Sequence, residues 1–585
     1  MRDFLDVFGA YDFLVRESLV LLLVALSIYL VLQAGMFALP QVGFMGIGGY
    51  VAAVASERYG VPMAGQLVLA ALAGALAGLV LGLLLARLDG IYLAIATIGF
   101  SEIVRLTARN LHITGGAVGL SGLDRTLWDA LIVAIVLLAL AVLGRLAYTR
   151  FGLGMTVMRE DPLTAAHQGV SVRGYRAALF TLSGFIAGTA GGLHIHLRGF
   201  IEPSLFSFEL LTTLLTVTVV GGMVSVMGPV LGGLVVFSLP EVLRSVDEYR
   251  NLVNGALLVA VLAFAPSGLV ELPRRLFQLV ARLARRRRTP AREALAAGPA
   301  PAGGSAGSVR VPSPRPATTS SPDPGRLPPG SDALVVTGLS KRFGGLQALD
   351  DVDLTVRRGE VFGLIGPNGS GKTTLLNVLS GVYHPDAGRG VVLGTPMDGE
   401  WGRPDRLARA GIARTFQTIR LLEGHTVREN VEAGAYLIQH SPLPAALLGV
   451  PSSRAERSAV RQRVSETLEL VGLGDLAGHE AGALPYGLQR RVEIARALVR
   501  GPGLLLLDEP TAGMTPQERD EIFRLVDRVR AQDIGVIVVE HDVQSMTTHC
   551  DRLAVLNFGH VISLGDPLSV MREEVVVDAY IGRRS

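Results

Sequence analysis

The feature that most constrains this chain is the octet at 366–373, which reads Gly-Pro-Asn-Gly-Ser-Gly-Lys-Thr. It fits the phosphate-binding loop pattern G-x-x-x-x-G-K-[ST] without a mismatch. The apolar run 361–365 before it suits a buried strand, and 374–379 after it has apolar residues at helical spacing. A strand, a glycine-rich loop and a helix start are the context that this pattern requires. The octet therefore predicts an α/β domain that binds a nucleotide.

The residue types in the octet fit phosphate chemistry. Backbone N–H groups of the loop and of the following helix would cradle phosphates. The Lys372 ammonium would reach the β/γ-phosphates, and the Thr373 hydroxyl would ligate Mg²⁺. A glycine-rich turn that binds nothing is the alternative, and the motifs further along the chain argue against it. The predicted nucleotide contacts here are Gly366, Pro367, Asn368, Gly369, Ser370, Gly371, Lys372, Thr373 and Thr374.

Hydropathy divides the chain into two dissimilar halves. Residues 18–270 hold long apolar stretches with few charges, whereas 332–585 has the composition of an ordinary soluble α/β domain. The net charge of +3 is small for 585 residues, so the composition predicts no nucleic-acid binding. Cys550 is the only cysteine, which excludes an intrachain disulfide and a cysteine-based metal site.

The apolar half predicts a polytopic helical bundle in a lipid bilayer. A membrane-spanning helix needs about 20 apolar residues. A ninth segment, 37–56, is rich in glycine and contains Pro40, so it either spans or forms a broken helix that lines a cavity. We therefore expect about eight to nine spans. The eight clearer stretches are 18–34, 64–86, 91–108, 127–147, 176–197, 209–227, 228–245 and 251–269.

The placement of arginines predicts the orientation of this bundle. Cytoplasmic loops carry an excess of Arg and Lys. Counting spans forward from the loop 148–175 brings a second arginine run, 282–288, to the same side, so we expect both in the cytoplasm. The N-terminus lies outside if 37–56 spans and inside if it is re-entrant. The arginines around the first loop are Arg145, Arg150, Arg159, Arg173 and Arg176.

The apolar half has two charged features, and each of them allows two interpretations. The loop 148–175 has a charged start, a proline and a short helix-forming stretch that ends at Gly169. It either docks on the soluble domain or is an ordinary solvated loop. Glu102 and Arg105 lie at i, i+3 spacing on one helix face, within pairing reach. They either lie on the substrate path or form a structural ion pair near the outer end of the helix.

Between the halves, residues 285–331 begin with arginines and continue as Ala, Pro, Gly and Ser without a hydrophobic period. Such a composition is typical of a disordered tether, which spans roughly 5–6 Å × √n. That reach lets a soluble domain find a docking loop on the same chain. The predicted domains are a transmembrane domain at 1–284, the linker at 285–331 and a nucleotide-binding domain at 332–585.

Acidic and basic side chains follow two apolar strands of the soluble half. Four leucines lead into Asp508 and Glu509, and the run 534–539 leads into Glu540 and His541. At a strand end beside a phosphate loop, Asp508 can hold Mg²⁺ and Glu509 can polarise an attacking water. His541 can reach the γ-phosphate. The plainer alternative for the two acids is a strand end that turns into solvent, and for His541 it is a structural histidine.

Residues 332–585 resemble the nucleotide-binding domain of the ATP-binding cassette (ABC) transporter family. Walker A matches 366–373 and Walker B matches 504–508. The resemblance implies that the nucleotide is ATP, that Glu509, Gln417 and His541 are catalytic, and that Thr373, Gln417 and Asp508 hold Mg²⁺. The matches to the catalytic glutamate, Q-loop, switch histidine and adenine-stacking aromatic are Glu509, Gln417, His541 and Phe343.

The signature segment departs from the family form Leu-Ser-Gly-Gly-Gln, because here it reads Leu-Pro-Tyr-Gly-Leu at 484–488. Proline supplies neither a serine hydroxyl nor a backbone N–H. Tyr486 and Gly487, with the helix that follows, could still face a phosphate. In this family the signature completes the ATP site of a partner subunit. The departure implies one weakened composite site if the partner ATPase is a different protein.

Further motifs are similar to the branched-chain (hydrophobic) amino-acid uptake branch of that family. They are Arg-Thr-Phe-Gln at 414–417 and Tyr-Gly-Leu-Gln-Arg-Arg at 486–491, with 90–105 and 228–232 in the apolar half. The resemblance implies a multidomain fold in which a type II importer-like membrane domain is fused to an ABC-type P-loop NTPase domain. It also implies ATP- and Mg²⁺-dependent import of branched-chain or related hydrophobic amino acids across the bacterial cytoplasmic membrane.

The expected partners are an external substrate-binding protein, a second permease and a second ATPase, or a second copy of this chain. Three alternatives stay open. Close relatives import urea or short amides. A membrane domain followed by an ATPase is also the layout of half-exporters, although these spans lack long cytoplasmic extensions. An ATPase that drives a membrane complex without transport is the third.

Overall fold

The computed structural model describes residues 2–123, 129–223, 225–242, 255, 259, 268–271 and 330–581. Nearly all of the predicted span 251–269 and of the predicted linker 285–331 lies outside the described residues. The chain forms two compact units. The first contains 1–211 and 327–585, and the second contains 212–326.

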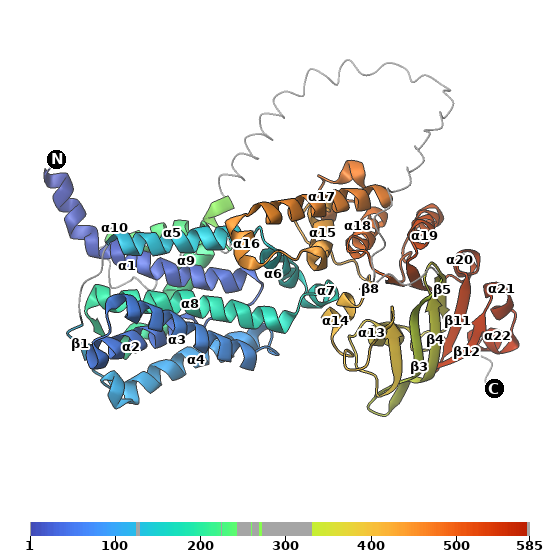
Figure 1. The fold of residues 1–585 in the computed structure, drawn as a ribbon, viewed down its shortest axis with the longest axis horizontal. Coiled ribbons are helices and arrows are strands. Elements are labelled where there is room, and N and C mark those ends of the chain that lie inside the picture. The colour runs from blue at the N-terminus through green and yellow to red at the C-terminus, as the bar shows by residue number, and fades with distance from the viewer. Residues whose placement is uncertain are drawn as a thin grey trace, which may run out of the picture. The chain divides into compact units, whose positions relative to one another are not determined.

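A bundle of long helices makes up the N-terminal part of the first unit (Figure 1). Five helices of the described residues are long and apolar enough to cross a membrane, and α2 joins them in the bundle. The glycine-rich segment predicted at 37–56 is one continuous helix, α2, which begins after Pro40. The bundle helices are α1 (Arg2–Gln33), α2 (Gln41–Tyr59), α3 (Met63–Leu84), α4 (Gly90–Asn110), α5 (Asp129–Leu146) and α8 (Val172–Arg198).

Glycine lets the helices of this bundle approach at backbone distance. A Cβ built on Gly78 of α3 would lie 2.1 Å from the Phe180 carbonyl oxygen of α8. One built on Gly48 of α2 would lie 2.4 Å from the Gly188 carbonyl oxygen of α8. Small residues permit this packing where lipid tails are as apolar as the side chains and supply no hydrophobic driving force. The small-residue runs of the sequence thus lie at helix–helix contacts.

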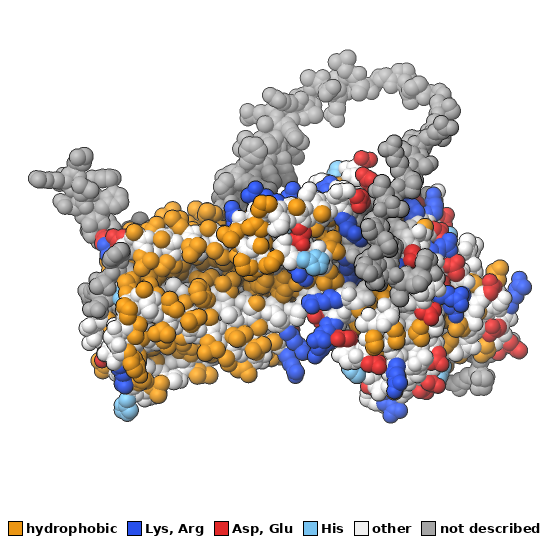
Figure 2. All heavy atoms as spheres, viewed as in Figure 1, with side chains coloured by type: hydrophobic (Ala, Val, Ile, Leu, Met, Phe, Trp, Pro, Cys, Tyr) orange, Lys and Arg blue, Asp and Glu red, His pale blue; other side chains and the backbone are white. Residues whose placement is uncertain are grey.

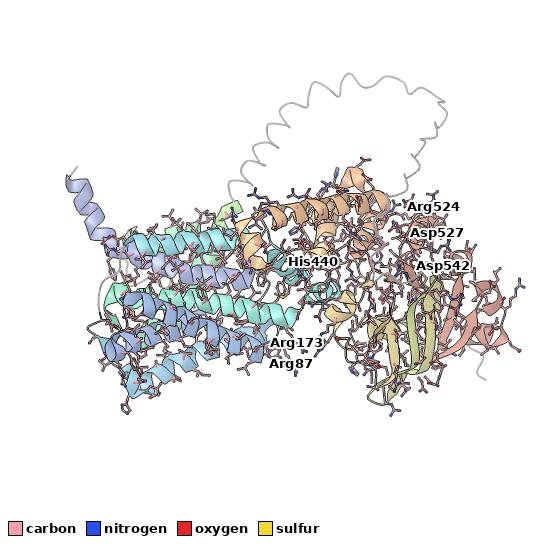
Figure 3. All side chains as sticks on the ribbon, viewed as in Figure 1. Arg87, Arg173, His440, Arg524, Asp527 and Asp542 are labelled. Atoms are coloured by element: carbon pink, nitrogen blue, oxygen red, sulfur yellow. The ribbon has the colours of Figure 1, made fainter. Side chains whose placement is uncertain are left out.

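Contacts along α1 show the direction in which this N-terminal helix runs through the bundle. Glu17 pairs with Arg198 at the end of α8, and the backbone of Gly35 lies against Arg159. The start of α1 therefore lies at the end opposite the arginine-rich loop. Figure 3 labels Arg87, which follows α3, and Arg173, which starts α8, at the loop's end of the bundle. If that loop is cytoplasmic, α1 starts outside, as expected for a spanning 37–56.

In the second unit, two shorter helices occupy the predicted spans 209–227 and 228–245. These are α9 (Phe208–Gly221), whose first residues belong to the first unit, and α10 (Gly228–Val242). A Cβ on Gly221 would lie 1.8 Å from the Gly228 carbonyl oxygen, so the helices touch where they meet. The 3-10 helix η4 (Leu269–Glu271) follows.

The soluble domain is built on two sheets. The larger has the order β12-β11-β5-β10-β9-β8, with β12 antiparallel at its edge and the other strands parallel. The smaller is antiparallel, in the order β4-β3-β6-β7. The strands of the larger sheet are β5 (Val361–Ile365), β8 (Ile412–Arg414), β9 (Leu504–Asp508), β10 (Gly535–Val539), β11 (Arg552–Asn557) and β12 (His560–Gly565), and those of the smaller are β3 (Asp332–Phe343), β4 (Leu346–Arg357), β6 (Ala387–Val392) and β7 (Thr395–Pro396).

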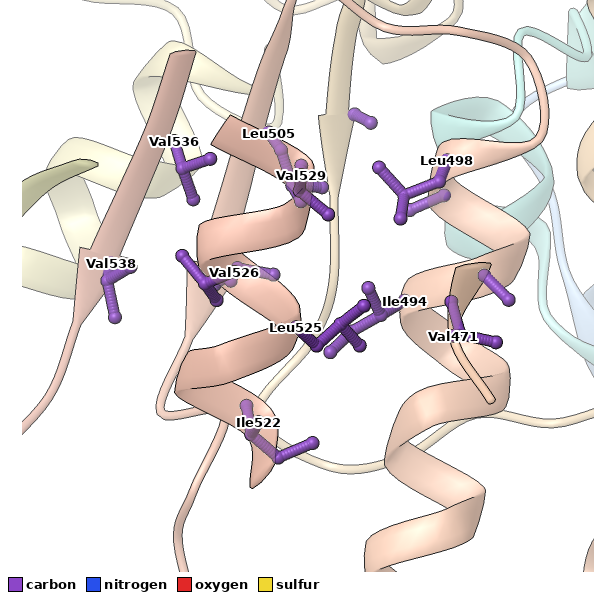
Figure 4. Packing of buried hydrophobic residues seen from close by; sticks show 14 of the residues in the cluster. Val471, Ile494, Leu498, Leu505, Ile522, Leu525, Val526, Val529, Val536 and Val538 are labelled. Carbon is purple, nitrogen blue, oxygen red and sulfur yellow. The ribbon is translucent and has the colours of Figure 1, made fainter. Parts of the chain in front are cut away.

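A buried apolar layer joins the larger sheet to its helices. In Figure 4, Leu525 of α19 (Pro516–Arg530) packs against Ile494 of α18 (Tyr486–Leu498), beside strand residues such as Leu505. The central strands β5, β9 and β10 are buried along their whole length, as parallel strands covered on both faces are. Their carboxyl ends meet at one edge, since Val539 of β10 pairs with Asp508 of β9.

The two parts of the first unit differ in their surfaces. Figure 2 shows hydrophobic side chains over the helical bundle and charged side chains over the soluble domain. Such a coat suits contact with lipid tails or with other membrane helices. The exposed apolar residues of α3, α4 and α5 include Leu72, Leu76, Leu83, Ile91, Ile95, Leu137 and Leu138.

We predict that Gly78→Val destabilises the chain by about 3 kcal/mol or more, because the added side chain meets α8 backbone that cannot move aside. Thermal unfolding of the full chain in detergent, followed by size-exclusion chromatography, measures the loss. Gly99→Val is the matched control, because no atom lies within 4 Å of a Cβ at Gly99. Equal unfolding temperatures for the two variants would contradict the close α3–α8 contact.

Candidate nucleotide-binding and hydrolysis site

The phosphate-binding loop connects β5 to α13 (Lys372–Leu379), as the sequence predicts. Gly371 caps the helix at φ +109°, a conformation that glycine adopts readily. At Gly366, an added Cβ would lie 2.1 Å from the Leu556 carbonyl oxygen, so only glycine fits there. The loop thus presents backbone at a helix N-terminus, where N–H groups and the helix dipole favour an anion.

Lys372 lies folded into this loop and is only 6% exposed. Its Nζ donates to the carbonyl oxygens of Gly366 at 2.7 Å and Pro367 at 2.9 Å. Burial lowers the pKa of the Lys372 ammonium, while Glu509 and Asp508 act in the opposite direction. Lys372 Nζ also lies 3.4 Å from the Ser370 hydroxyl, so the acceptors around the cation are neutral, and a phosphate oxygen would be a stronger acceptor.

Asp508 ends β9 as a buried carboxylate. Its Oδ2 accepts from Arg414 Nη2 at 3.1 Å. Arg414 ends the neighbouring strand β8 and also donates to Asn377 and Ser380 on the far end of α13. The same guanidinium therefore ties the acidic strand to the helix of the phosphate-binding loop.

Glu509 is the point at which the predicted catalytic residues converge. Gln417 Nε2 donates to its Oε2 at 3.0 Å, and His541 Nε2 lies 3.0 Å from its Oε1. The three side chains come from segments up to 124 residues apart, since 541 minus 417 is 124. Glu509 has φ +46°, an uncommon backbone conformation for a residue that is not glycine. The turn after β9 thereby aims the carboxylate between its two partners.

A buried ion pair that the sequence analysis did not identify holds this arrangement. Arg490 is 0% exposed, and its Nη1 lies 2.7 Å from Glu493 Oε2 in the same helix. It also donates to the carbonyl oxygens of Phe416, Gln417 and Glu509. Glu493 Oε1 accepts from the Phe416 N–H at 3.1 Å. The only sequence signal was the Gln-Arg-Arg run, which does not reveal burial.

The remaining predicted nucleotide contacts lie on other elements. Tyr486 and Gly487 form the first turn of α18 after Pro485, with Tyr486 exposed and Gly487 facing Glu518 of α19. Phe343 ends β3, is 41% exposed and meets the Tyr383 ring edge-on at 5.1 Å. An exposed aromatic face is available there for stacking. These roles stay predictions.

Oxygen ligands rather than a metal cluster characterise the site. Within the described part of the chain, no group of three or more His, Cys, Asp and Glu residues gathers as a metal site. Thr373 is exposed beside Lys372, and Asp508 offers one carboxylate. Mg²⁺ is commonly held by one or two protein oxygens together with substrate phosphates. The residues present fit a nucleotide that brings its own Mg²⁺.

The loop between α5 and α8 contacts the soluble domain, so the docking interpretation is confirmed. It carries α6 (Arg150–Glu160) and α7 (Pro162–His167). Asp161 caps α7 and accepts from Arg420 at 2.5 Å, three residues after Gln417. His167 lies edge-on to the Phe416 ring at 5.0 Å.

The charge state of this contact follows from its burial. Burial lowers the pKa of His167 to about 3, so the imidazole is neutral near pH 7. Burial acts to raise the pKa of Asp161, but hydrogen bonds from Thr164 and Arg420 lower it below its usual value. Asp161 is therefore an anion that faces the Arg420 cation. A cavity of about 460 Å³ adjoins the pair, lined by residues that include Thr164, Arg420, Gln489 and Arg496.

Comparison with known proteins matches both halves. A family model described as the permease component of branched-chain amino acid transport systems matches residues 10–262. The ABC transporter model matches residues 349–512. The two matches do not overlap, so one chain contains both kinds of domain.

The relatives of the soluble half are ATP-binding proteins. The chain is 37% identical over 250 residues to the high-affinity branched-chain amino acid transport ATP-binding protein BraF of Pseudomonas aeruginosa, covering 43% of this chain and 97% of BraF. LivG of Salmonella typhimurium, of the same description, is 38% identical with the same coverage. The methionine import ATP-binding protein MetN of Geobacillus kaustophilus is 38% identical over 230 residues, 39% of this chain and 63% of MetN.

We predict that Glu509→Gln lowers ATP hydrolysis by about 10²–10⁴-fold, because it removes the carboxylate that Gln417 and His541 both contact. Phosphate release by the assembled complex measures the rate. ATP binding should persist, since Lys372 and the loop are untouched. Retained wild-type hydrolysis would remove Glu509 from the role of base.

We also predict that Arg490→Met destabilises the soluble domain by about 3–5 kcal/mol, because Glu493 stays buried without its partner. The double variant with Glu493→Leu should recover at least half of that loss. Its ATP hydrolysis should stay low, because the Gln417 and Glu509 carbonyls still lack their donor. Unfolding curves and phosphate release separate the two effects. Recovery of both would show that Arg490 only stabilises the fold.

Proposed function

The chain belongs to the ABC transporter family, and from that premise we propose that it imports branched-chain amino acids as a fused permease and ATPase subunit. The observation that carries the proposal is the pairing of a branched-chain amino acid permease domain with an ATPase domain like BraF and LivG. MetN, which is named as a methionine import protein, is as similar in sequence to this chain over its matched part as BraF and LivG are. The similarity of the ATPase half alone therefore does not indicate the substrate. The substrate assignment rests on the match of the permease half.

The nucleotide site supplies the energy. ATP would lie on the phosphate-binding loop, with its phosphates on the backbone N–H groups and on Lys372. Phe343 would stack on adenine. Mg²⁺, held by Thr373, Asp508 and Gln417, would neutralise charge on the phosphates.

Hydrolysis needs a base and groups that orient it. Glu509 would accept a proton from the attacking water, since it directly follows Asp508, the last residue of β9, at the sheet edge where the carboxyl ends of the strands meet. Gln417 and His541 each hold one oxygen of that carboxylate, which fixes its direction. On binding a nucleotide, both side chains could transfer their hydrogen bonds to water or phosphate. Tyr486 and Gly487 would serve the second ATP site of the assembled pair.

The docking loop would carry the motion of the ATPase domain to the membrane helices. Arg420 and Phe416 flank Gln417, and both contact the loop. A shift of Gln417 therefore displaces the surface on which Asp161 and His167 rest. Because α7 leads directly into α8, that displacement reaches the bundle.

Assembly and location complete the proposal. A second permease and a second ATPase, or another copy of this chain, would complete the transporter, and an external binding protein would deliver substrate. We place the bundle in the bacterial cytoplasmic membrane with the ATPase domain in the cytoplasm. The domain limits 1–284, 285–331 and 332–585 fit this arrangement.

Uptake in the native host tests the function. Cells that lack the chromosomal gene and carry a plasmid copy should accumulate labelled leucine, isoleucine and valine, and cells with Glu509→Gln should not. Labelled urea and acetamide test the alternative substrates in the same cells. Inverted membrane vesicles test direction, because ATP-driven uptake into them would mean export. Wild-type cells that take up urea but no leucine would overturn the substrate assignment.

We predict that Asp161→Asn lowers leucine uptake about two- to fivefold, because asparagine can still cap α7 but no longer pairs with Arg420 as an anion. Asp161→Ala, which loses the cap as well, should lower it about tenfold. ATP hydrolysis should fall less than uptake in both, which marks uncoupling. Glu160→Gln, a neighbouring exposed charge, is the control. Equal uptake in all three would contradict a coupling role for Asp161.

A further inference from the structure

An ion pair lies on the exposed side of a membrane-spanning helix. In α4, Arg105 Nε donates to Glu102 Oε2 at 2.9 Å, and a second guanidinium nitrogen reaches the other carboxylate oxygen. The Glu102 side chain is 44% exposed and the Arg105 side chain is 26% exposed. Apolar residues of α4 are exposed on either side of the pair up to Leu106, namely Ile91, Ile95, Ile103 and Leu106, and exposed polar residues follow only from Thr107 to the end of the helix. The pair therefore lies within the apolar stretch of the α4 surface.

Contacts to neighbouring helices place the pair deep in the bundle. Ser101, which precedes Glu102, accepts from the Gly43 N–H at 3.3 Å near the start of α2. Gln41, two residues earlier, lies 3.4 Å from Ser183 of α8. Ser183 lies 11 residues after Val172 and 15 before Arg198, which is about 16 Å and 22 Å from the ends of α8 at about 1.5 Å per residue.

A second measure, taken along α4 itself, gives a similar depth. Asp89, just before α4, pairs with Arg176 near the start of α8. Glu102 follows Gly90 by 12 residues, or about 18 Å along the helix. The hydrocarbon core of a bilayer is about 30 Å thick. Asn110, the last residue of α4, follows Glu102 by eight residues, or about 12 Å, and Arg105 by five residues, or about 8 Å. The pair thus lies inside the core, with Glu102 the deeper of the two.

Lipid tails cannot be the neighbours of this pair. Charged side chains at such depth almost always face a bundle interior or a water-filled cavity. The carboxylate and guanidinium exposed here match the ammonium and carboxylate of a zwitterion in charge and in hydrogen-bonding capacity. A neutral urea or amide would need no such pair. The surface therefore distinguishes between the classes of substrate.

We propose that Glu102 and Arg105 line the transport path and bind the α-ammonium and α-carboxylate of the amino acid during its passage, an inference that rests on the proposed import of amino acids. Substrate enters by exchanging the internal ion pair for two pairs of its own. The apolar residues around the pair suit a branched side chain. Glu102 and Arg105 thereby select zwitterions within the membrane domain itself.

Uptake of labelled leucine at saturating concentration tests this in cells that express the full chain with its natural partners. Glu102→Gln and Arg105→Gln should each lower the rate at least about tenfold, the effect of losing a hydrogen bond to a charged group. Arg109→Gln, an exposed arginine in the last turn of the same helix, should stay within about twofold. Immunoblots of membranes establish equal amounts of each variant.

The exchanged variant, with Glu102→Arg and Arg105→Glu, separates recognition from structure. It keeps both charges and an ion pair, so it should accumulate in the membrane even where the single variants do not. Uptake should stay at least tenfold reduced, because the two charges have changed places relative to the side-chain surface. Restored uptake would identify a structural ion pair and overturn the proposal, as would unaffected single variants. Failure of wild-type cells to take up leucine would instead overturn the proposed function.

Discussion

The catalytic edge of the ATPase domain depends on one buried guanidinium. Arg490 donates to four backbone carbonyls that belong to two distant segments, the Q-loop and the end of β9 with the turn after it. Glu493 neutralises it and takes up the Phe416 N–H. Desolvation makes such a pair costly unless its hydrogen bonds are made. Here the backbone that presents Gln417 and Glu509 accepts these hydrogen bonds. The same hydrogen bonds therefore satisfy the buried charge and hold the two site residues in position.

The membrane half solves a different problem by similar means. Apolar helices gain little from contact with one another in lipid, so their packing relies on close approach and on polar groups that find partners. Gly78 and Gly48 permit backbone contact with α8. Thr97 and Ser101 of α4 accept the Leu39 and Gly43 N–H groups near the start of α2. This non-helical start is tolerated because protein groups satisfy its backbone.

The sequence predicted the parts of the site that are local and missed those that are not. A contiguous motif fixes the loop around Lys372, and an apolar run fixes the strand before Asp508, so both were predictable. The convergence of Gln417 and His541 on Glu509 was implied only by the resemblance to a family. The role of Arg490 was not foreseen, because an arginine after a signature segment reads as a surface residue until its surroundings are known.

Depth in the membrane was also beyond sequence counting. The spacing of Glu102 and Arg105 predicted their pairing, which the structure confirms. Counting along α4 alone favoured a position near its outer end. The contacts of Ser101 with α2, and of α2 with α8, shift that level inward. Relative helix heights are set by long-range packing, which no single segment encodes.

Carrying the permease and the ATPase on one polypeptide changes what their mutual contact must achieve. Translation delivers the two in equal numbers, and covalent linkage in general raises the local concentration of joined partners, up to the millimolar range for short flexible linkers. An intramolecular contact at that concentration needs little free energy of its own. The partly exposed pair of Asp161 and Arg420 is of the weak kind, worth about 0–1 kcal/mol. Because of the covalent linkage, the contact between the loop and the ATPase domain can break and re-form without separating the ATPase domain from the permease domain.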